Sequence, residues 1–181
     1  QDKGRFIVLE GIDGAGTTTQ AARAVQWLEA RGEEALMTAQ PSTGPVGRLL
    51  RDYLRGNAGL DGAPMQTTPE VIALLFAGDR LDHLAGQIVP ALERGCHVIC
   101  DRYVLSSLAY QGVEVDEGFV QRVNAHAPPP DLTVFLRVDP AVAMERIRDS
   151  RSEREIFENL PFQRRVAVNY DRVMETWAQS G

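Results

Sequence analysis

The sequence predicts one α/β domain in which a parallel β-sheet carries helices on both faces. Short apolar runs without strict alternation, the pattern of strands buried on both sides, begin at Phe6, Ala35, Cys96 and Leu132. Segments with helical periodicity separate these runs, and alternation of strand and helix builds a parallel sheet. The length of 181 residues also fits one domain, because domains hold roughly 150 residues.

The elements of the first half follow from their apolar pattern and their end residues. Gly32 can adopt the left-handed backbone that closes a helix, and Pro45 has the fixed φ of a first helical residue. Pro90 is expected to kink the helix that contains it. The predicted elements are a strand over Phe6–Glu10, a helix over Thr18–Arg31, a strand over Ala35–Thr38, a helix from Pro45 to about Leu54 and a long helix over Pro69–Arg94.

The second half alternates in the same way. Asp139–Pro140 supplies the cap and first turn of a helix, and Pro128–Pro130 forms a stiff link. Ligands of such sheets bind beyond the carboxyl ends of the strands, so residues 11–18, 40–44 and 101–103 are expected to share one edge. The predicted elements are a strand over Cys96–Cys100, helices over Ser106–Gln111 and Asp116–Ala127, a strand over Leu132–Val138, a helix from Asp139 to about Asp149 and a helix over Glu158–Trp177.

The composition excludes several functional classes. The formal net charge is −6, whereas a general nucleic-acid binder would carry a basic face, so no nucleic-acid partner is expected. A small polyanionic substrate remains compatible, because a pocket can be locally basic. No apolar run approaches the length of a membrane span and no signal peptide is visible, so no membrane association is expected. Cys96 and Cys100 have neither a zinc nor a haem spacing, and a cytoplasmic location is expected.

The most specific motif has the shape of a phosphate-binding loop between a strand and a helix. It runs through Gly11, Ile12, Asp13, Gly14, Ala15, Gly16, Thr17 and Thr18. In the template G-x-x-x-x-G-K-[ST], backbone amides surround the phosphates, the Lys reaches the β- and γ-phosphates, and the hydroxyl holds Mg²⁺. Both glycines and Thr18 match, but Thr17 takes the Lys position. A general preference for Arg over Lys, visible elsewhere in the chain, would place Arg there instead. A tight turn without a ligand is the alternative.

A second candidate follows the third predicted strand. Asp101 stands where enzymes with such a loop hold Mg²⁺, and Arg102 could clamp a phosphoryl group. The alternative is that Asp101 caps a helix and Arg102 lies on the surface.

Two positions on the long helix form a third candidate. Phe76 and Arg80 are four residues apart and therefore share a helical face. An aromatic ring that stacks on a base, one turn from an Arg that holds a phosphate, would make a nucleotide pocket. A core Phe beside a solvated ion pair is the alternative.

A fourth candidate is an Arg-rich segment between the last two helices. Its arginines are suited to a mobile lid that closes over transferring phosphates, although a solvated charged loop has the same composition. The residues are Arg146, Arg148, Arg151 and Arg154.

Together these residues resemble the thymidylate kinases, of the P-loop nucleoside monophosphate kinase group. The likeness covers nearly the whole chain in order, and the combination of motifs is specific to that family. The matching segments are residues 11–20, 75–80, 101–103, 106–111, 130–132 and 155–162. The resemblance implies a three-layer P-loop NTPase fold with a short lid over about residues 148–157. It also implies transfer of the γ-phosphoryl group of ATP to dTMP with Mg²⁺, and a homodimer formed through long apolar helices such as Pro69–Arg94.

The resemblance also implies individual roles. Asp13 would hold the deoxyribose 3′-OH, Phe76 would stack on thymine, and Tyr110 would crowd the 2′ position. Arg102 would bridge the acceptor phosphate. The positions implied for the dTMP site are Asp13, Arg48, Arg51, Phe76, Arg80, Arg102, Ser107, Tyr110 and Gln111; Thr18 and Asp101 would hold the metal.

Three departures from the family pattern concern mainly the donor side. Thr17 replaces the catalytic Lys, Gln40 stands where many members have an acidic residue, and the chain ends at Gly181, where the family has another strand and helix. Either this last part was removed or is disordered, or this member lacks it. The sequence also predicts that Arg148, Arg151 or Arg154 supplies the missing charge. Two alternatives stay open: a degenerate nucleotide-binding protein with little turnover, and a kinase for another nucleoside monophosphate.

Overall fold

The computed structural model describes residues 3–57, 63, 66–150 and 159–180. Within them, the strands form one parallel sheet in the order β2-β3-β1-β4. The strands are β1 (Phe6–Glu10), β2 (Ala35–Ala39), β3 (His97–Asp101) and β4 (Leu132–Phe135). The predicted parallel sheet is confirmed, although β4 ends three residues earlier than expected.

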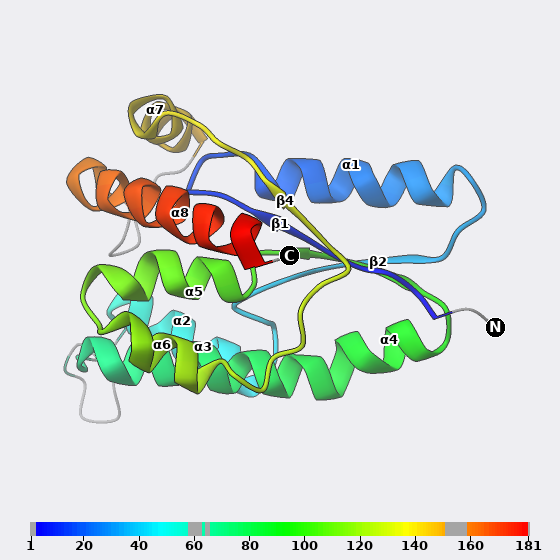
Figure 1. The fold of residues 1–181 in the computed structure, drawn as a ribbon, viewed down its shortest axis with the longest axis horizontal. Coiled ribbons are helices and arrows are strands. Elements are labelled where there is room, and N and C mark those ends of the chain that lie inside the picture. Colours follow the sequence, from blue (N-terminus) through cyan, green and yellow to red (C-terminus); the bar gives the residue numbers. More distant parts are fainter. Residues whose placement is uncertain (1–2, 58–62, 64–65, 151–158, 181) are drawn as a thin grey trace.

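Helices connect the strands and follow them (Figure 1). In chain order they are α1 (Thr17–Glu29), α2 (Pro45–Arg55), α3 (Pro69–His83), η1 (Leu84–Ile88), α4 (Val89–Glu93), α5 (Val104–Tyr110), η2 (Gln111–Val113), α6 (Glu117–Val123), α7 (Pro140–Ser150) and α8 (Leu160–Ser180).

The alternation of side chains along β1 and β3 explains why both faces are covered. Leu9 and Ile99 point to one face, where Ala21 of α1 packs on them. The neighbouring strand residues point to the opposite face, where η1 and α4 pack, because successive side chains of a strand alternate. Figure 1 shows α1 on one side of the sheet and α4 on the other. The predicted layering is therefore confirmed.

The long helix predicted over residues 69–94 is present but interrupted. A π-helical turn, η1, lies between α3 and α4, directly before Pro90. Because Pro90 has no amide hydrogen, the helix cannot form its regular bond there, and the wider turn takes up the misfit. The expected irregularity at Pro90 is thus a local widening.

The register of the sheet brings the predicted motifs to one edge. Leu9 lies opposite Asp101 on one side and Val134 on the other, so the carboxyl ends of three strands coincide. The amide of Gln40 also donates to the carbonyl of Asp101 at 3.0 Å. Residues that are distant in sequence therefore surround one site, as the rule for parallel sheets predicts.

Two further findings bear on the predictions. Among the helices of the described residues, none has the length and apolarity needed to cross a membrane. The predicted lid over about residues 148–157 lies almost entirely outside the described residues.

Candidate active site

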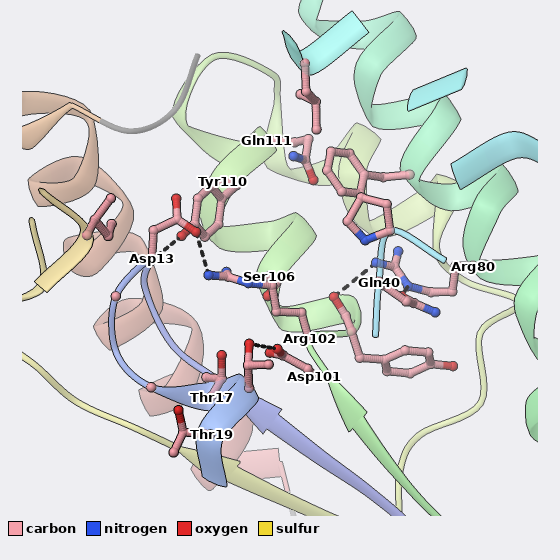
Figure 2. A pocket seen from close by; sticks show the side chains of 18 of the residues that line it. Asp13, Thr17, Thr19, Gln40, Arg80, Asp101, Arg102, Ser106, Tyr110 and Gln111 are labelled. Carbon is pink, nitrogen blue, oxygen red and sulfur yellow. Dashed lines mark hydrogen bonds and ion pairs between the residues drawn. The ribbon is translucent and has the colours of Figure 1, made fainter. Parts of the chain in front are cut away.

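A cavity of about 410 Å³ lies at the carboxyl edge of the sheet (Figure 2). Its walls come from the phosphate loop and the start of α1, the loop after β2, helices α2 and α3, the turn between β3 and α5, α5 with η2, and α7. This volume is within the usual range for small-molecule sites.

The phosphate loop forms one end of the cavity. Gly14 and Gly16 have φ angles of 78° and 95°, a region that favours glycine. A Cβ atom on Gly14 would lie 2.3 Å from the carbonyl oxygen of Ala143, so α7 packs too closely for any side chain there. No side chain caps the N-terminus of α1. Its first amides are therefore available to an anion at the cavity wall.

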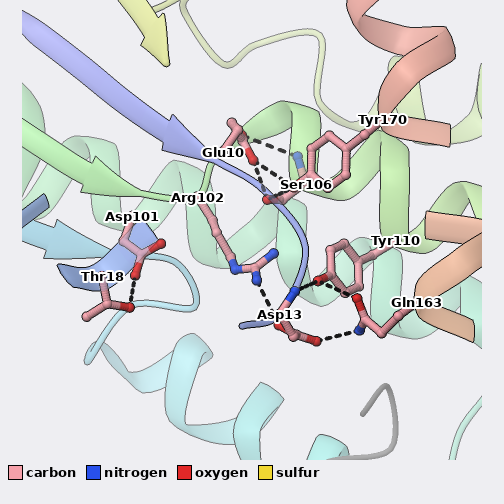
Figure 3. Close-up of polar contacts among 9 residues, drawn as sticks. All are labelled: Glu10, Asp13, Thr18, Asp101, Arg102, Ser106, Tyr110, Gln163 and Tyr170. Carbon is pink, nitrogen blue, oxygen red and sulfur yellow. Dashed lines mark hydrogen bonds and ion pairs between the residues drawn. The ribbon is translucent and has the colours of Figure 1, made fainter. Parts of the chain in front are cut away.

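Thr18 and Asp101 form a pair of oxygen groups beside this loop. The Thr18 hydroxyl donates to Oδ2 of Asp101 (Figure 3), while Oδ1 of Asp101 is buried without a hydrogen-bond partner in the described structure. A buried carboxylate oxygen of this kind is suited to Mg²⁺, which prefers hard oxygen ligands and keeps several waters. The described residues hold no cluster of three or more His, Cys, Asp or Glu side chains. The arrangement therefore fits a metal bound by two protein groups together with substrate phosphates and water.

Asp13 connects the phosphate loop to three other elements. Nη2 of Arg102 donates to its Oδ1 at 2.7 Å, and Nε2 of Gln163 on α8 donates to its Oδ2 at 2.7 Å. The backbone amide of Asp13 donates to the Tyr110 hydroxyl at 2.8 Å. Figure 3 shows these side chains converging on Asp13. The loop and Arg102 are thus held together before any substrate binds.

Arg102 keeps its charge in this half-buried position. Burial alone would lower the pKa of Arg102, but the neighbouring Tyr110 and Asp13 side chains raise it well above its ordinary value. Its backbone φ is 74°, which is rare for a residue other than glycine. A fixed cation on an unusual turn is a common feature of functional sites.

Arg80 lies at the opposite end of the cavity and is 1% exposed. Its Nε donates to Oε1 of Gln40 at 2.9 Å, and Nη2 donates to the carbonyl of Tyr103 and the hydroxyl of Ser107, both at 3.0 Å. Nη1 donates to Oδ1 of Asn124. All these acceptors are neutral, and burial lowers the pKa of Arg80.

The residue before Arg80 points to different partners. Asp79 is fully buried and accepts a hydrogen bond from the amide of Ser42 at 2.7 Å and another from the Ser42 hydroxyl. Adjacent Asp79 and Arg80 therefore do not form a solvated ion pair, while Phe76, one turn before Arg80, lines the same cavity.

Comparison with known proteins agrees with this geometry. A sequence model of the family described as "Thymidylate kinase" matches residues 9–180. The chain belongs to the thymidylate kinase family. A "Probable thymidylate kinase" from Pyrococcus abyssi is 39% identical over 180 residues, which cover 98% of this chain and 86% of the relative. A protein with the same description from Pyrobaculum calidifontis is 43% identical, over 91% of this chain and 80% of the relative. Another from Methanococcus vannielii is 38% identical, over 94% of this chain and 78% of the relative.

Most of the site residues expected from the thymidylate kinase resemblance line the cavity. They are Asp13, Gly14, Gly16, Thr17, Thr18, Phe76, Arg80, Asp101, Arg102, Tyr110 and Gln111. The side-chain amide atoms of Gln111 are buried and have no hydrogen-bond partner in the described structure. Gln111 therefore presents both a donor and an acceptor to the cavity.

Several other predicted residues of this family site do not line the cavity. Arg51 donates to the carbonyls of Pro41 and Ser42, and Ser107 lies behind Arg80. Arg48 donates to the carbonyl of Thr43 at 2.7 Å and is exposed. The remaining residues that do not line it are Gly11, Ile12 and Ala15 of the loop.

The predicted lid arginines are only partly described. Arg148 is exposed and lies 3.8 Å from Glu145, whereas Arg151 and Arg154 lie outside the described residues. Arg146, two residues before the predicted lid, lines the cavity. Its Nη1 is 3.4 Å from the carbonyl oxygen of Gly14.

Some polar residues near the site were not predicted, among them Thr19 and Ser106, which line the cavity, and two residues behind it. Gln163 is fully buried on α8 and contacts Asp13 from 150 positions away, and no local sequence signal marks it. Glu10 is also fully buried, and burial raises its pKa above the ordinary value, although hydrogen bonds from Ser106 and Tyr170 lower it. A charged residue at the end of an apolar strand was the available signal for Glu10.

Proposed function

We propose that this chain transfers the γ-phosphoryl group of ATP to dTMP, which yields ADP and dTDP for dTTP synthesis in the cytoplasm. Membership of the thymidylate kinase family supports the reaction class. The observation that carries the proposal is that one cavity joins the phosphate loop to Phe76, Arg80 and Arg102. A nucleotide base, its phosphate and a donor triphosphate can therefore lie within the same space.

In this proposal the phosphate loop binds the donor. The backbone amides at the start of α1 face the triphosphate, and the positive end of the helix dipole favours its negative charge. Thr18 and Asp101 would hold Mg²⁺, which neutralises charge on the β- and γ-phosphates during transfer. The orphaned oxygen of Asp101 supports this assignment.

The acceptor binds at the other end of the cavity. Phe76 stacks on thymine, while the buried Arg80 and the unpartnered amide of Gln111 address the polar edge of the base. Tyr110 lies under the sugar, and Asp13 accepts from its 3′-OH. An aromatic wall with few convergent polar groups supports recognition of a pyrimidine.

Arg102 orients the acceptor phosphate for transfer. An oxygen of that phosphate attacks the γ-phosphorus of ATP, and the bond from the γ-phosphorus to the β,γ-bridging oxygen breaks. Arg102 reduces repulsion between the two anions, which is the main barrier to their approach. Its paired and fixed guanidinium supports this role.

Arg146 takes the place of the Lys that Thr17 replaces. The Thr17 side chain is buried and neutral, so it brings no charge to the donor phosphates. Within the described residues, Arg80 donates to several neutral groups and Arg102 donates to the Asp13 carboxylate, whereas Arg146 donates only to the Gly14 carbonyl. Arg148, Arg151 and Arg154 remain predicted contributors from the lid.

A homodimer belongs to the same proposal. A stripe of exposed apolar side chains runs along α3 to α4, and residues three to four apart share one helical face. The exposed residues of this stripe are Val71, Leu74, Leu81 and Val89. A Leu74→Glu chain is expected to sediment as a monomer where the unmodified chain sediments as a dimer.

The decisive experiment measures ADP release from ATP, Mg²⁺ and one nucleoside monophosphate at a time. We expect dTMP to give the highest kcat/KM in a panel with dUMP, dCMP, AMP and GMP. Preference for dCMP or AMP would assign the chain to another monophosphate instead.

Thr17 is the reason to retain a second candidate, a nucleotide-binding protein with little turnover. Calorimetry with dTMP separates it from an active kinase. Tight binding of dTMP without ADP release above the enzyme-free rate would establish the binding protein and exclude the kinase.

A further inference from the structure

The Glu10 carboxylate is buried beside the start of α5 and Tyr170. It ends β1, directly before Gly11, and is fully buried. It does not line the active-site cavity, and no described cation lies within ion-pair distance of it. Buried carboxylates are rare unless they have partners, so its hydrogen bonds require an explanation.

Those hydrogen bonds converge on the start of α5. Oε1 accepts from the amides of Tyr103 at 2.9 Å and Ser106 at 3.3 Å. Oε2 accepts from the hydroxyls of Ser106 and Tyr170, the latter at 2.9 Å. Figure 3 shows Glu10 between Ser106 and Tyr170. No side chain at the N-cap of α5 serves its free amides, so Glu10 caps this helix from a neighbouring strand.

The same interaction holds the strained turn that carries Arg102. The amide of Arg102 donates to the carbonyl of Leu9 at 2.9 Å, and the next amide, of Tyr103, donates to Glu10. The last two residues of β1 therefore hold both amides that flank the Arg102 Cα atom. With φ at 74°, this turn directs the guanidinium to Asp13.

We propose that Glu10 is a positioning residue, which holds Arg102 at a set distance from the phosphate loop. The proposal rests on the proposed kinase function. Because β1 leads into the loop and also holds the Arg102 turn, a single strand end aligns the donor loop with the acceptor cation. The reach of the carboxylate to the two amides, rather than its charge, carries this role.

A pair of substitutions separates reach from charge. Glu10→Gln keeps an acceptor oxygen at the same distance but removes the charge, and we expect kcat within about fivefold of the unmodified chain. Glu10→Asp keeps the charge but withdraws the carboxylate by one methylene, and we expect kcat to fall by about thirtyfold or more. Glu29→Asp on the exposed face of α1 is the matched control. The measurements are kcat, KM for each substrate and the melting temperature.

A double-mutant cycle tests whether Glu10 acts through Arg102. In an Arg102→Ala background, Glu10→Asp is expected to lower kcat by less than about threefold, because its target is already missing. An equal loss in both backgrounds would mean a general structural role and overturn the proposal, as would an unchanged kcat in Glu10→Asp alone.

Two controls keep these outcomes distinct. If Glu10→Asp does not fold, the kcat of Glu10→Gln tests the proposal. A fall in kcat much larger than fivefold would show that the charge of Glu10 matters more than its reach, and would overturn the proposal. If the unmodified chain releases no ADP with dTMP, the kinase function itself fails. If the unmodified chain turns over normally and Glu10→Asp has the same kcat as Glu29→Asp, only the positioning role of Glu10 is rejected.

Discussion

The two ends of the cavity are built in different ways. At the acceptor end, most polar side chains are already paired: the half-buried Asp13 with Arg102 and Gln163, and the buried Arg80 with a set of neutral groups. At the donor end, the backbone supplies most donors, Thr17 is neutral, and Arg146 is exposed with one long contact to the loop. In the proposed assignment, the acceptor end is thus preorganised, and the donor end depends for its charge on an exposed Arg and on a metal ion.

This difference suggests a division of tasks. Selectivity requires fixed groups, because an unpaired buried group penalises the wrong base. Donor binding requires neutralisation of several negative charges, which an exposed Arg and a metal ion can supply when the triphosphate arrives. The following predictions test this contrast, from the largest expected effect to the smallest.

Removal of Arg102 is expected to have the largest effect. Arg102→Ala should lower kcat/KM for dTMP by about a hundred- to a thousandfold, because it removes a fixed cation from the transferring groups. The affinity for ATP alone should change little. Steady-state kinetics and calorimetry measure the two quantities, and a comparable loss of ATP affinity would contradict the contrast between the two ends.

Neutralisation of Asp101 is expected to have the next largest effect. Asp101→Asn should lower kcat by about a hundredfold and raise the Mg²⁺ concentration that half-saturates activity, because a metal ligand is lost. A Mg²⁺ titration of ADP release measures both. An unchanged Mg²⁺ requirement would remove Asp101 from the metal site.

Loss of Arg146 should affect the donor alone. Arg146→Ala is expected to raise KM for ATP about tenfold, because one charge-assisted phosphate contact disappears. Arg122→Ala is the control, since Arg122 of α6 is exposed beside Asp116 and does not line the cavity, and it should leave KM within about twofold. Equal effects of the two changes would reject the assignment of Arg146.

Restoration of the usual Lys is expected to have the smallest effect. Thr17→Lys should raise kcat/KM for ATP by less than about tenfold, which is less than Arg146→Ala removes, because Arg146 already supplies the charge. A larger gain in kcat/KM for ATP would show that no other residue compensates for the Lys missing at position 17. The Arg146→Ala, Thr17→Lys double variant provides a direct check, because Lys should then recover most of the lost activity.

Comparison of particular residues shows why prediction succeeded for some features. Gly14 and Gly16 belong to a local pattern, and their φ angles follow from the tight turn that this pattern requires. Asp101 was predictable because a strand delivers its last residue to a known edge. The roles of these residues in catalysis remain predictions.

Other features left no local trace. The neutral surroundings of Arg80 depend on Gln40, Asn124 and Ser107, which come from three separate segments. Arg48 was assigned to a phosphate by resemblance, but its side chain turns to the carbonyl of Thr43. Such partners depend on how elements pack, which periodicity does not specify.

By itself, the sequence determined the parallel α/β sheet, the phosphate loop with its neutral Thr17, and the edge where the site forms. These features depend on residue periodicity and on turn chemistry, which act between near neighbours. Only the tertiary structure decided that Gln163 holds Asp13, that Glu10 caps α5, and that Arg146 faces the loop. The physical reason is that a buried polar group must find its partner wherever packing places one, at any distance along the chain.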